Sequence, residues 1–386
     1  MGAKKMMKIV CDENIPLAEH YFASLGEISF YPGREISAEY VRDADVLLVR
    51  SITKVDERLL KGSRISFVGT ATIGEDHIDK RYLRQAGIGF SSAPGCNANS
   101  VAEYVLAALF DWWENPEIVK SVSSLDQLSV GIVGAGNVGA RVKLLCDALG
   151  ICAFCYDPLK PEWAHIQFED LRTADVVSFH TPLTHGGPFP TYHLADQAFI
   201  ESLKPGALLL NSGRGAVVDN AALIDALQRG QRLHVCLDVW EAEPNINCEL
   251  AAACYLATPH IAGYSYDGKV AGTRMLYQAL CQHLSLESPP QSSSEVARID
   301  IPQSKLIASK SAIAACIRHA YSIREDDAGL RALLATVTGA SELSEGFDAL
   351  RKSYRKRREF SCYTFSRDGL VLRDQAHLEK IGFLPK

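Results

Sequence analysis

Short apolar segments alternate with stretches of helical periodicity along the first hundred residues. The apolar runs predict strands at residues 8–10, 45–49, 65–68 and 88–90. The amphipathic stretches predict helices at residues 16–25 and 79–85, and a nearby glycine, Gly26 or Gly87, is typical of a helix C-cap. This alternation favours a parallel sheet with helices on both faces.

The same alternation restarts after a longer helix, which the periodicity predicts at residues 99–113. Strands are predicted at residues 129–133, 151–156, 176–179, 207–211, 233–239 and 255–258. A helix predicted at residues 268–284 closes this segment, so we expect a second α/β unit here.

The composition changes after residue 286. Serine and proline dominate residues 288–294, which is typical of a linker. Beyond it, helices are predicted at residues 308–321, 327–337 and 344–358, and short strands at residues 360–365 and 370–372. We expect a small α+β piece, and it contains no recognisable chemical motif.

Composition and charge narrow the class of protein. At about 150 residues per domain, 386 residues correspond to two or three domains. A net charge of −6 provides no global basic field, so we expect no nucleic acid and no membrane as partners.

Residues 1–8 lack the apolar stretch of a secretory signal, and the 11 cysteines are scattered, which together predict a cytoplasmic protein with reduced thiols. We interpret Cys152 and Cys155 as part of a buried strand, and we predict no metal site.

A glycine-rich loop follows the strand predicted at residues 129–133. Gly134, Gly136 and Gly139 form the pattern GxGxxG, and Asn137 and Val138 open the next helix. The glycines allow a tight turn, close approach of a pyrophosphate, and close helix–strand packing. The pattern alone is weak, but this context predicts a dinucleotide on the helix N-terminus.

Asp157 ends the next predicted strand, about twenty residues beyond the loop, where an acidic residue binds the adenosine ribose. It would repel the 2′-phosphate of NADP and so favours NAD, although Lys160 lies nearby in sequence. The alternative is a surface aspartate in a turn before a proline.

Three further clusters lie at the carboxyl ends of predicted strands, where ligands bind in open α/β sheets. Arg214, between glycines, is suited to hold a substrate carboxylate bidentately. His260 has the intrinsic pKa of a base, and Glu243 is the candidate to hold its tautomer. Asp238 is placed to bind the nicotinamide carboxamide. Three of these residues have a structural alternative. His260 could be a hydrogen-bonded core histidine, Glu243 a solvated turn residue, and Arg214 the partner of a surface acid.

The sequence resembles the D-2-hydroxyacid dehydrogenase family over nearly its whole length. The resemblance rests on FVGTATIG at residues 67–74, APGCN at 93–97, FHTPL at 179–183, RGAVVDN at 214–220 and TPHIAGY at 258–264. It implies an α/β fold with two doubly wound parallel-sheet domains, a flavodoxin-like substrate domain and a Rossmann NAD domain, plus a small α+β C-terminal domain. Residues 94–97 and the C-terminal domain are similar to a branch that oxidises a phosphorylated hydroxy acid.

The resemblance also implies domain boundaries and partners. The substrate-binding domain would comprise residues 1–105 and 268–286, and the NAD-binding domain residues 106–267. Residues 287–386 would form a domain through which two copies make a homodimer. The stretch between Asp157 and Thr181 is short for the family.

Roles are carried over by position. Arg214, Glu243 and His260 match the catalytic residues, with His260 as the proton acceptor in oxidation. NAD contacts match Asp157, Thr181, Asp238 and Gly263, in addition to the loop Gly134, Gly136, Asn137, Val138 and Gly139. Substrate contacts match Ser51, Thr72 and Tyr264.

The substrate's phosphate needs cationic partners. Arg50, beside Ser51 at a strand end, is the candidate anchor, and residues 351–358 are the densest basic run. That run is either a solvated helix surface or close to a phosphate site, in which case it could act across the dimer. Two further readings of the whole chain stay open: a dehydrogenase of the glyoxylate or 3-phosphoglycerate type, and a non-catalytic NAD-sensing protein.

Overall fold

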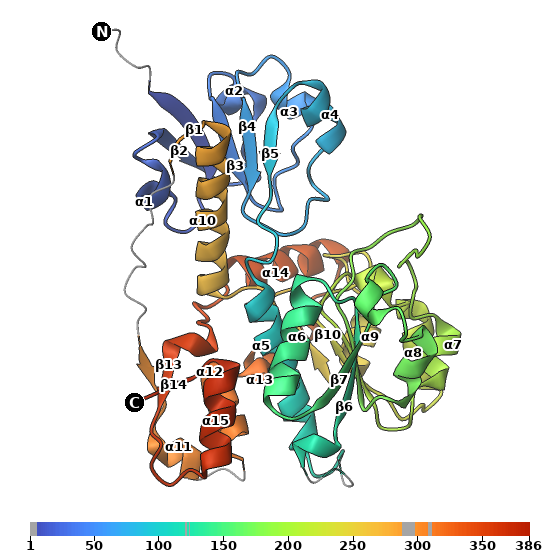
Figure 1. Cartoon of the computed structure of the whole chain (residues 1–386). Coiled ribbons are helices and arrows are strands. Elements are labelled where there is room, and N and C mark those ends of the chain that lie inside the picture. Colours follow the sequence, from blue (N-terminus) through green and yellow to red (C-terminus); the bar gives the residue numbers. More distant parts are fainter. Residues whose placement is uncertain (1–5, 120–121, 123, 288–297, 308–310) are drawn as a thin grey trace. The chain divides into compact units, whose positions relative to one another are not determined.

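A computed structural model describes residues 6–119, 122, 124–287, 298–307 and 311–386 (Figure 1). The chain forms two compact units. The first comprises Met1–Asn97 and Ser265–Glu295, and the second Ala98–Tyr264 and Val296–Lys386. The predicted linker at residues 288–294 and the start of the helix predicted from residue 308 lie outside the described residues. Among the described residues, no helix is both long enough and apolar enough to cross a membrane.

The first unit contains a parallel five-stranded sheet in the order β2-β1-β3-β4-β5, which is the flavodoxin-like order. Its strands are β1 (Met7–Asp12), β2 (Gly26–Tyr31), β3 (Val46–Val49), β4 (Phe67–Thr70) and β5 (Gly89–Ser91). Its helices are α1 (Ala18–Phe22), α2 (Ala38–Val41), α3 (Glu57–Leu60), α4 (Lys80–Gln85) and α10 (Tyr266–His283). Helix α10 returns after the second unit in sequence and packs on β4 and α1.

The second unit contains a parallel six-stranded sheet in the order β11-β10-β9-β8-β6-β7. Its strands are β6 (Ser129–Val133), β7 (Cys152–Tyr156), β8 (Val176–Phe179), β9 (Leu208–Asn211), β10 (His234–Leu237) and β11 (Leu256–Ala257). The helices between and beside them are α5 (Ala98–Trp113), α6 (Asn137–Ala148), α7 (Gln197–Ser202), α8 (Asn220–Gln228) and α9 (Cys248–Ala253). The strand order reverses at β6, and ligands bind outside the carboxyl ends of the strands at such a switch point.

The short stretch between Asp157 and Thr181 has a structural explanation. Between β7 and β8 the chain forms two 3-10 helices, Pro161–Trp163 and Phe168–Thr173, and no further strand. The sheet therefore ends at β7 on this side.

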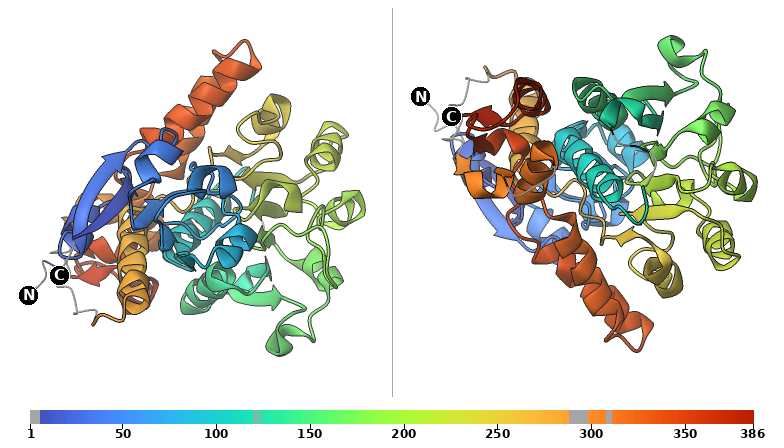
Figure 2. Two further views of the ribbon diagram at one scale, coloured as in Figure 1. Left: turned by 90° about the horizontal axis from the view of Figure 1, so that it is seen from above. Right: turned by 90° about the horizontal axis from the view of Figure 1, so that it is seen from below.

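The C-terminal segment belongs to the second unit. It contributes a three-stranded sheet of β12 (Ile299–Asp300), β13 (Tyr363–Phe365) and β14 (Leu384–Pro385). Its helices are α11 (Gln303–Ile307), α12 (Ala312–Ala320), α13 (Ile323–Leu334), α14 (Ala340–Lys352) and α15 (Leu372–Ile381). Helices α12 and α13 contact α5, and α15 contacts α6 (Figure 2). The segment thus packs on the part of the unit that contains the six-stranded sheet and shares its apolar cores.

Three local predictions are wrong. Residues 370–372 form no strand: Val371 is the N-cap of α15, and Leu372, its first residue, is 83% exposed, so this apolar run is a surface helix start. The helix predicted to residue 358 ends at Lys352, because the arginines beyond it bind partners on different elements. Cys152 is exposed, and only Cys155 of the pair is buried.

Candidate active site

The glycine loop between β6 and α6 depends on one left-handed backbone position and one close approach of the backbone. Gly134 has φ +89°, in the left-handed region that favours glycine. A Cβ on Gly139 would lie 1.9 Å from the carbonyl oxygen of Gly134, so only glycine fits. A Cβ on Gly136 would meet nothing within 4 Å. The space above Gly136, where α6 begins with Asn137 and Val138, is therefore open to a ligand at the positive end of a helix dipole.

Asp157 and Lys160 hold this loop from the end of β7. The Asp157 Oδ2 atom accepts a hydrogen bond from the backbone N–H of Ala135 at 2.9 Å, and Lys160 donates to the carbonyl oxygen of Ala135. The structure thus places a carboxylate beside the loop, with its Oδ1 bonded to the N–H of Leu159. Ribose binding by Asp157 stays a prediction.

Thr181 lies against the same loop after β8. Its Oγ1 is buried and has no hydrogen-bond partner among the described residues. A Cβ on Gly134 would come within 2.8 Å of its Cγ2. Beside it, burial lowers the pKa of His180 to about 3, so this imidazole is neutral. An orphaned hydroxyl next to an open glycine cradle fits a bound dinucleotide, so these residues suit NAD.

His260 and Glu243 form a hydrogen-bonded pair. His260 Nδ1 lies 2.7 Å from Glu243 Oε2, and Glu243 Oε1 accepts the backbone N–H of Trp240 at 2.7 Å. Burial would raise the pKa of Glu243, but the charge of His260, these hydrogen bonds and the charge of Arg351 outweigh it and hold the pKa below its usual value. The ionised carboxylate fixes the proton on Nδ1 and leaves Nε2 as a proton acceptor.

Asp238, at the end of β10, fixes the loop that contains His260. Its carboxylate accepts hydrogen bonds from the backbone N–H groups of Ile261 at 2.7 Å and Ala262 at 2.9 Å, and from the hydroxyl of Thr258 at 2.7 Å. It is 1% exposed, and burial raises its pKa. Asp238 therefore positions the loop that contains His260 and the adjoining Gly263, whereas nicotinamide binding by Asp238 and NAD binding by Gly263 stay predictions.

Arg214 follows β9, the neighbour of β10 in the sheet. Buried Asn211 donates to the carbonyl oxygen of Arg214 at 2.9 Å, which fixes its backbone. A Cβ on Gly215 would lie 2.0 Å from the backbone of Trp240, so glycine lets the two loops meet. The loops of Arg214, Glu243 and His260 thus follow β9, β10 and β11, at one edge of the sheet.

The predicted substrate residues Arg50, Ser51 and Thr72 belong to the first unit. Arg50 and Ser51 follow β3, and Thr72 follows its neighbour β4, where its hydroxyl lies 2.8 Å from that of Thr70. Sequence reasoning missed Lys269 on α10. Burial and the adjacent charge of Arg50 lower the pKa of Lys269 to about 8, so two cations lie near each other here.

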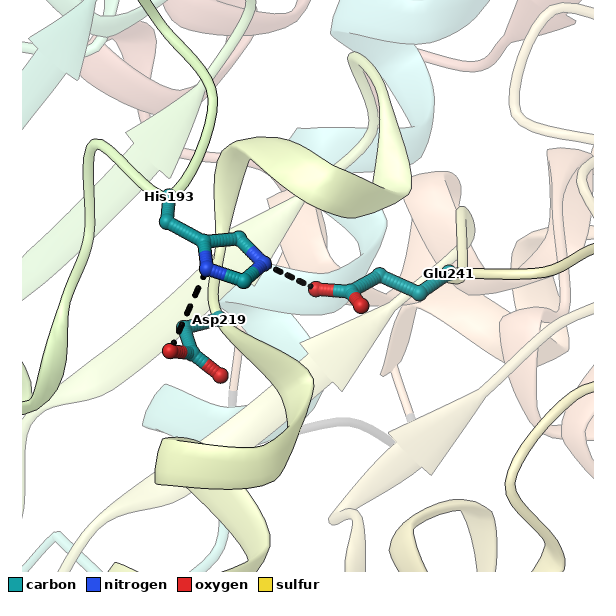
Figure 3. Close-up of side chains that lie close together, drawn as sticks. All are labelled: His193, Asp219 and Glu241. Atoms are coloured by element: carbon teal, nitrogen blue, oxygen red, sulfur yellow. Dashed lines mark hydrogen bonds and ion pairs between the residues drawn. The ribbon is translucent and has the colours of Figure 1, made fainter.

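A second group that sequence reasoning missed links three loops of the second unit. His193 lies between two carboxylates, with Nε2 2.8 Å from Glu241 Oε1 and Nδ1 3.3 Å from Asp219 Oδ2 (Figure 3). Asp219 also caps α8 through the N–H of Ala222. The three are far apart in sequence without a ligand-like spacing, so no signal identified them. Because each side chain is already bonded to another protein group, we assign this triad to fixing the loops after β9 and β10.

The comparisons with known proteins agree with this arrangement. Residues 103–262 match the family described as D-isomer specific 2-hydroxyacid dehydrogenase, NAD binding domain, and residues 293–382 match a domain of unknown function. An erythronate-4-phosphate dehydrogenase from Cellvibrio japonicus is 47% identical over 92% of this chain and 94% of its own length. The chain belongs to the erythronate-4-phosphate dehydrogenase family. Another member of that family, from Pseudomonas putida, is 46% identical over 92% of this chain and 93% of its own length.

Solved structures show the same fold. A D-lactate dehydrogenase from Aquifex aeolicus, complexed with NAD and lactic acid, has a TM-score of 0.59 and 25% identity, and the match covers 72% of this chain and 95% of that one. An NAD-bound 3-phosphoglycerate dehydrogenase from Entamoeba histolytica has a TM-score of 0.61 and 25% identity, covering 75% and 99%. The expected family and fold are confirmed, and residues 103–262 are an NAD-binding domain.

Proposed function

We propose that this chain oxidises 4-phospho-D-erythronate at C2 to 2-oxo-3-hydroxy-4-phosphobutanoate and reduces NAD to NADH, in cytoplasmic pyridoxal phosphate biosynthesis. The observation that carries the proposal is the hydrogen-bonded pair of His260 and Glu243 at the strand ends of an NAD-binding domain. The name of its relatives, at 43–47% identity, supplies the substrate.

The proton transfer follows from the geometry of the pair. His260 Nε2 accepts the C2 hydroxyl proton, and Glu243 stabilises the imidazolium that forms because its carboxylate lies 2.7 Å from Nδ1. When bound, NAD supplies the acceptor for the hydride that leaves C2. Arg214 holds the substrate carboxylate and polarises the carbonyl that develops at C2. Tyr264, Ser51 and Thr72 contact the rest of the substrate.

The phosphate distinguishes this substrate from other 2-hydroxy acids. The protein carries a net charge of −6, so a few placed cations must bind the phosphate instead of a general positive field. Arg50 is the proposed anchor, and Lys269 lies near it: burial and then repulsion from Arg50 lower the pKa of Lys269 to about 8. A phosphate dianion would relieve that repulsion.

A substrate panel with NAD tests the proposal. Turnover of 4-phosphoerythronate should exceed that of glycerate 3-phosphate, glycolate and D-lactate in kcat/KM. Preference for one of these would place the chain with another 2-hydroxy acid. Tight NAD binding without turnover of any of them would make it an NAD sensor.

The proposal includes a homodimer formed through the C-terminal segment, residues 287–386. Its support is the family resemblance, together with a separate three-stranded sheet and helices in this segment. Light scattering of the purified protein should give twice the monomer mass of 42.2 kDa. A monomer at micromolar concentration would contradict it.

A further inference from the structure

Helix α14 of the C-terminal segment is anchored on the catalytic side of the NAD-binding sheet. Leu343 and Phe347 are buried in the apolar cluster that also contains Trp240, Leu237 and Ala257. Gly346 packs closely on α13, since a Cβ there would lie 2.2 Å from the side chain of Leu333. This apolar face fixes α14 relative to the loops after β10 and β11.

Arg351 lies one helical turn beyond Phe347 and so on the same side of α14. Its side chain is only 19% exposed. The guanidinium carbon lies 5.7 Å from the centre of the Tyr264 ring, and the side chain forms a hydrogen bond with Tyr264. An ion pair with Asp348 at 3.8 Å is long, and the buried Nε has no hydrogen-bond partner among the described residues. The main neighbours of Arg351 are therefore residues that the family likeness places in the active site.

The charge of Arg351 also reaches Glu243. Burial raises the pKa of Glu243, whereas His260, the hydrogen bond from Trp240 and, as the smallest of these contributions, the charge of Arg351 lower it. In return, Tyr264 and Glu243 raise the pKa of Arg351 against the effect of its own burial. A buried carboxylate is costly unless opposite charges face it. Glu243 is thus hydrogen-bonded to His260 from the loop after β11 and is stabilised electrostatically by Arg351 from α14, while Asp348 pairs with Arg351 on its own helix.

We propose that Arg351 is a positioning residue of its own chain's active site: it lies over the Tyr264 ring and holds in place Tyr264 and the loop that contains both Tyr264 and His260. The C-terminal segment is then part of the catalytic machinery and does more than join two copies. The inference rests on the proposed function, since it assigns Glu243 and His260 their catalytic roles. It differs from the hypothesis that the basic run binds the substrate's phosphate.

The test compares Arg351→Gln and Arg351→Lys with the control Lys352→Gln in the full-length protein. Lys352 is the exposed last residue of α14, so its substitution removes the same charge from the helix surface. We expect Arg351→Gln to lower kcat by roughly 10- to 100-fold, as misplaced catalytic groups do, with a smaller rise in KM because Tyr264 is a proposed substrate contact. Without the positive charge, the protonated form of the Glu243–His260 pair is favoured, so the acid limb of the pH–rate profile should move to higher pH. Arg351→Lys should restore part of kcat and most of the acid limb.

Other outcomes separate the alternatives. If all three variants match the parent in kcat and pH profile, the inference is wrong. If Arg351→Gln raises KM for the phosphorylated substrate alone, at unchanged kcat, Arg351 binds phosphate and the positioning role is overturned. NAD binding and thermal unfolding report whether each variant is folded. If the Arg351→Gln variant does not fold, Arg351→Lys still tests the inference. If the parent turns over a different 2-hydroxy acid, the proposed substrate fails, and the comparison is run on that acid.

Discussion

At the scale of single residues, His260 depends on its backbone as much as on its ring. It has φ +57°, a conformation that costs a non-glycine residue on the order of 1–3 kcal/mol. The buried carboxylate of Asp238 offsets this by binding the N–H groups of the two following residues, Ile261 and Ala262. The ring is thereby brought to Glu243 by a loop whose hydrogen bonds are inaccessible to water.

Replacing His260 by Asn should therefore remove the base without unfolding the loop. We expect kcat to fall by roughly 10²- to 10⁴-fold, the usual contribution of general base catalysis, with NAD affinity unchanged. Steady-state kinetics and NAD titration measure both quantities. His165→Asn is the matched control, because His165 is exposed and distant in sequence from the loop that contains His260. Near-normal turnover of His260→Asn would refute the role of His260 as the base.

The carboxylate of Asp157 has two roles that an experiment must separate, because it accepts a hydrogen bond within the protein and is also the proposed partner of the ribose. Asp157→Ala should weaken NAD binding by about tenfold or more, because a hydrogen bond to a charged group contributes roughly 1.5–3 kcal/mol. It should also narrow the preference for NAD over NADP. Asp157→Asn separates the two effects: it still accepts the N–H of Ala135 but lacks the charge that repels a 2′-phosphate. Equal use of both cofactors by the parent would show that the ribose assignment is wrong.

At the scale of elements, the loop between β6 and α6 allows two glycines to be tested against each other. Gly139→Ala forces a Cβ against the carbonyl of Gly134 and should destabilise the fold by about 1–3 kcal/mol, as overpacking does. Gly136→Ala places its Cβ in open space, so the melting temperature without cofactor should stay close to that of the parent. NAD affinity should nevertheless fall, because the methyl group occupies the approach of the pyrophosphate. Unchanged NAD affinity of a folded Gly136→Ala protein would contradict this use of the loop.

The elements also show what sequence patterns can and cannot predict. Strands β6 and β8 match their predicted bounds, because both are buried on both faces and read as continuous apolar runs. Strand β2 was missed because it is an edge strand whose sequence, GEISFY, mixes exposed and partly buried positions. The glycine loop and the strand-end clusters follow from local spacing. The His193–Asp219–Glu241 triad, Lys269 near Arg50, and Arg351 over the Tyr264 ring depend on tertiary packing, which no local pattern encodes.

At the scale of the whole molecule, the C-terminal segment completes the NAD-binding unit. Ala257 at the end of β11 donates its N–H to Asp327 of α13 at 2.8 Å. Buried Glu103 of α5 accepts a hydrogen bond from the N–H of Phe360 at 2.8 Å. Burial and the charge of Glu359 raise the pKa of Glu103, and the charge of Arg357 opposes this rise. Arg357 also donates to the carbonyl oxygen of Ala262, in the loop of His260. These bonds make the segment a structural layer of the unit in addition to its proposed role in dimerisation.

This layer predicts how the protein responds to losing its contacts. Phe347 on α14 is fully buried, so Phe347→Ala should destabilise the second unit by about 3–5 kcal/mol and lower its melting temperature. Leu372→Ala, at an 83% exposed position of the same segment, is the matched control and should change little. A segment that served only to join two copies would give a different result, because Phe347→Ala would then alter the dimer and leave the thermal stability and NAD affinity of the subunit unchanged. Thermal unfolding with and without NAD measures the stability of the subunit, and light scattering measures the dimer. A subunit that loses stability while the dimer persists is expected only if α14 is part of the NAD-binding core.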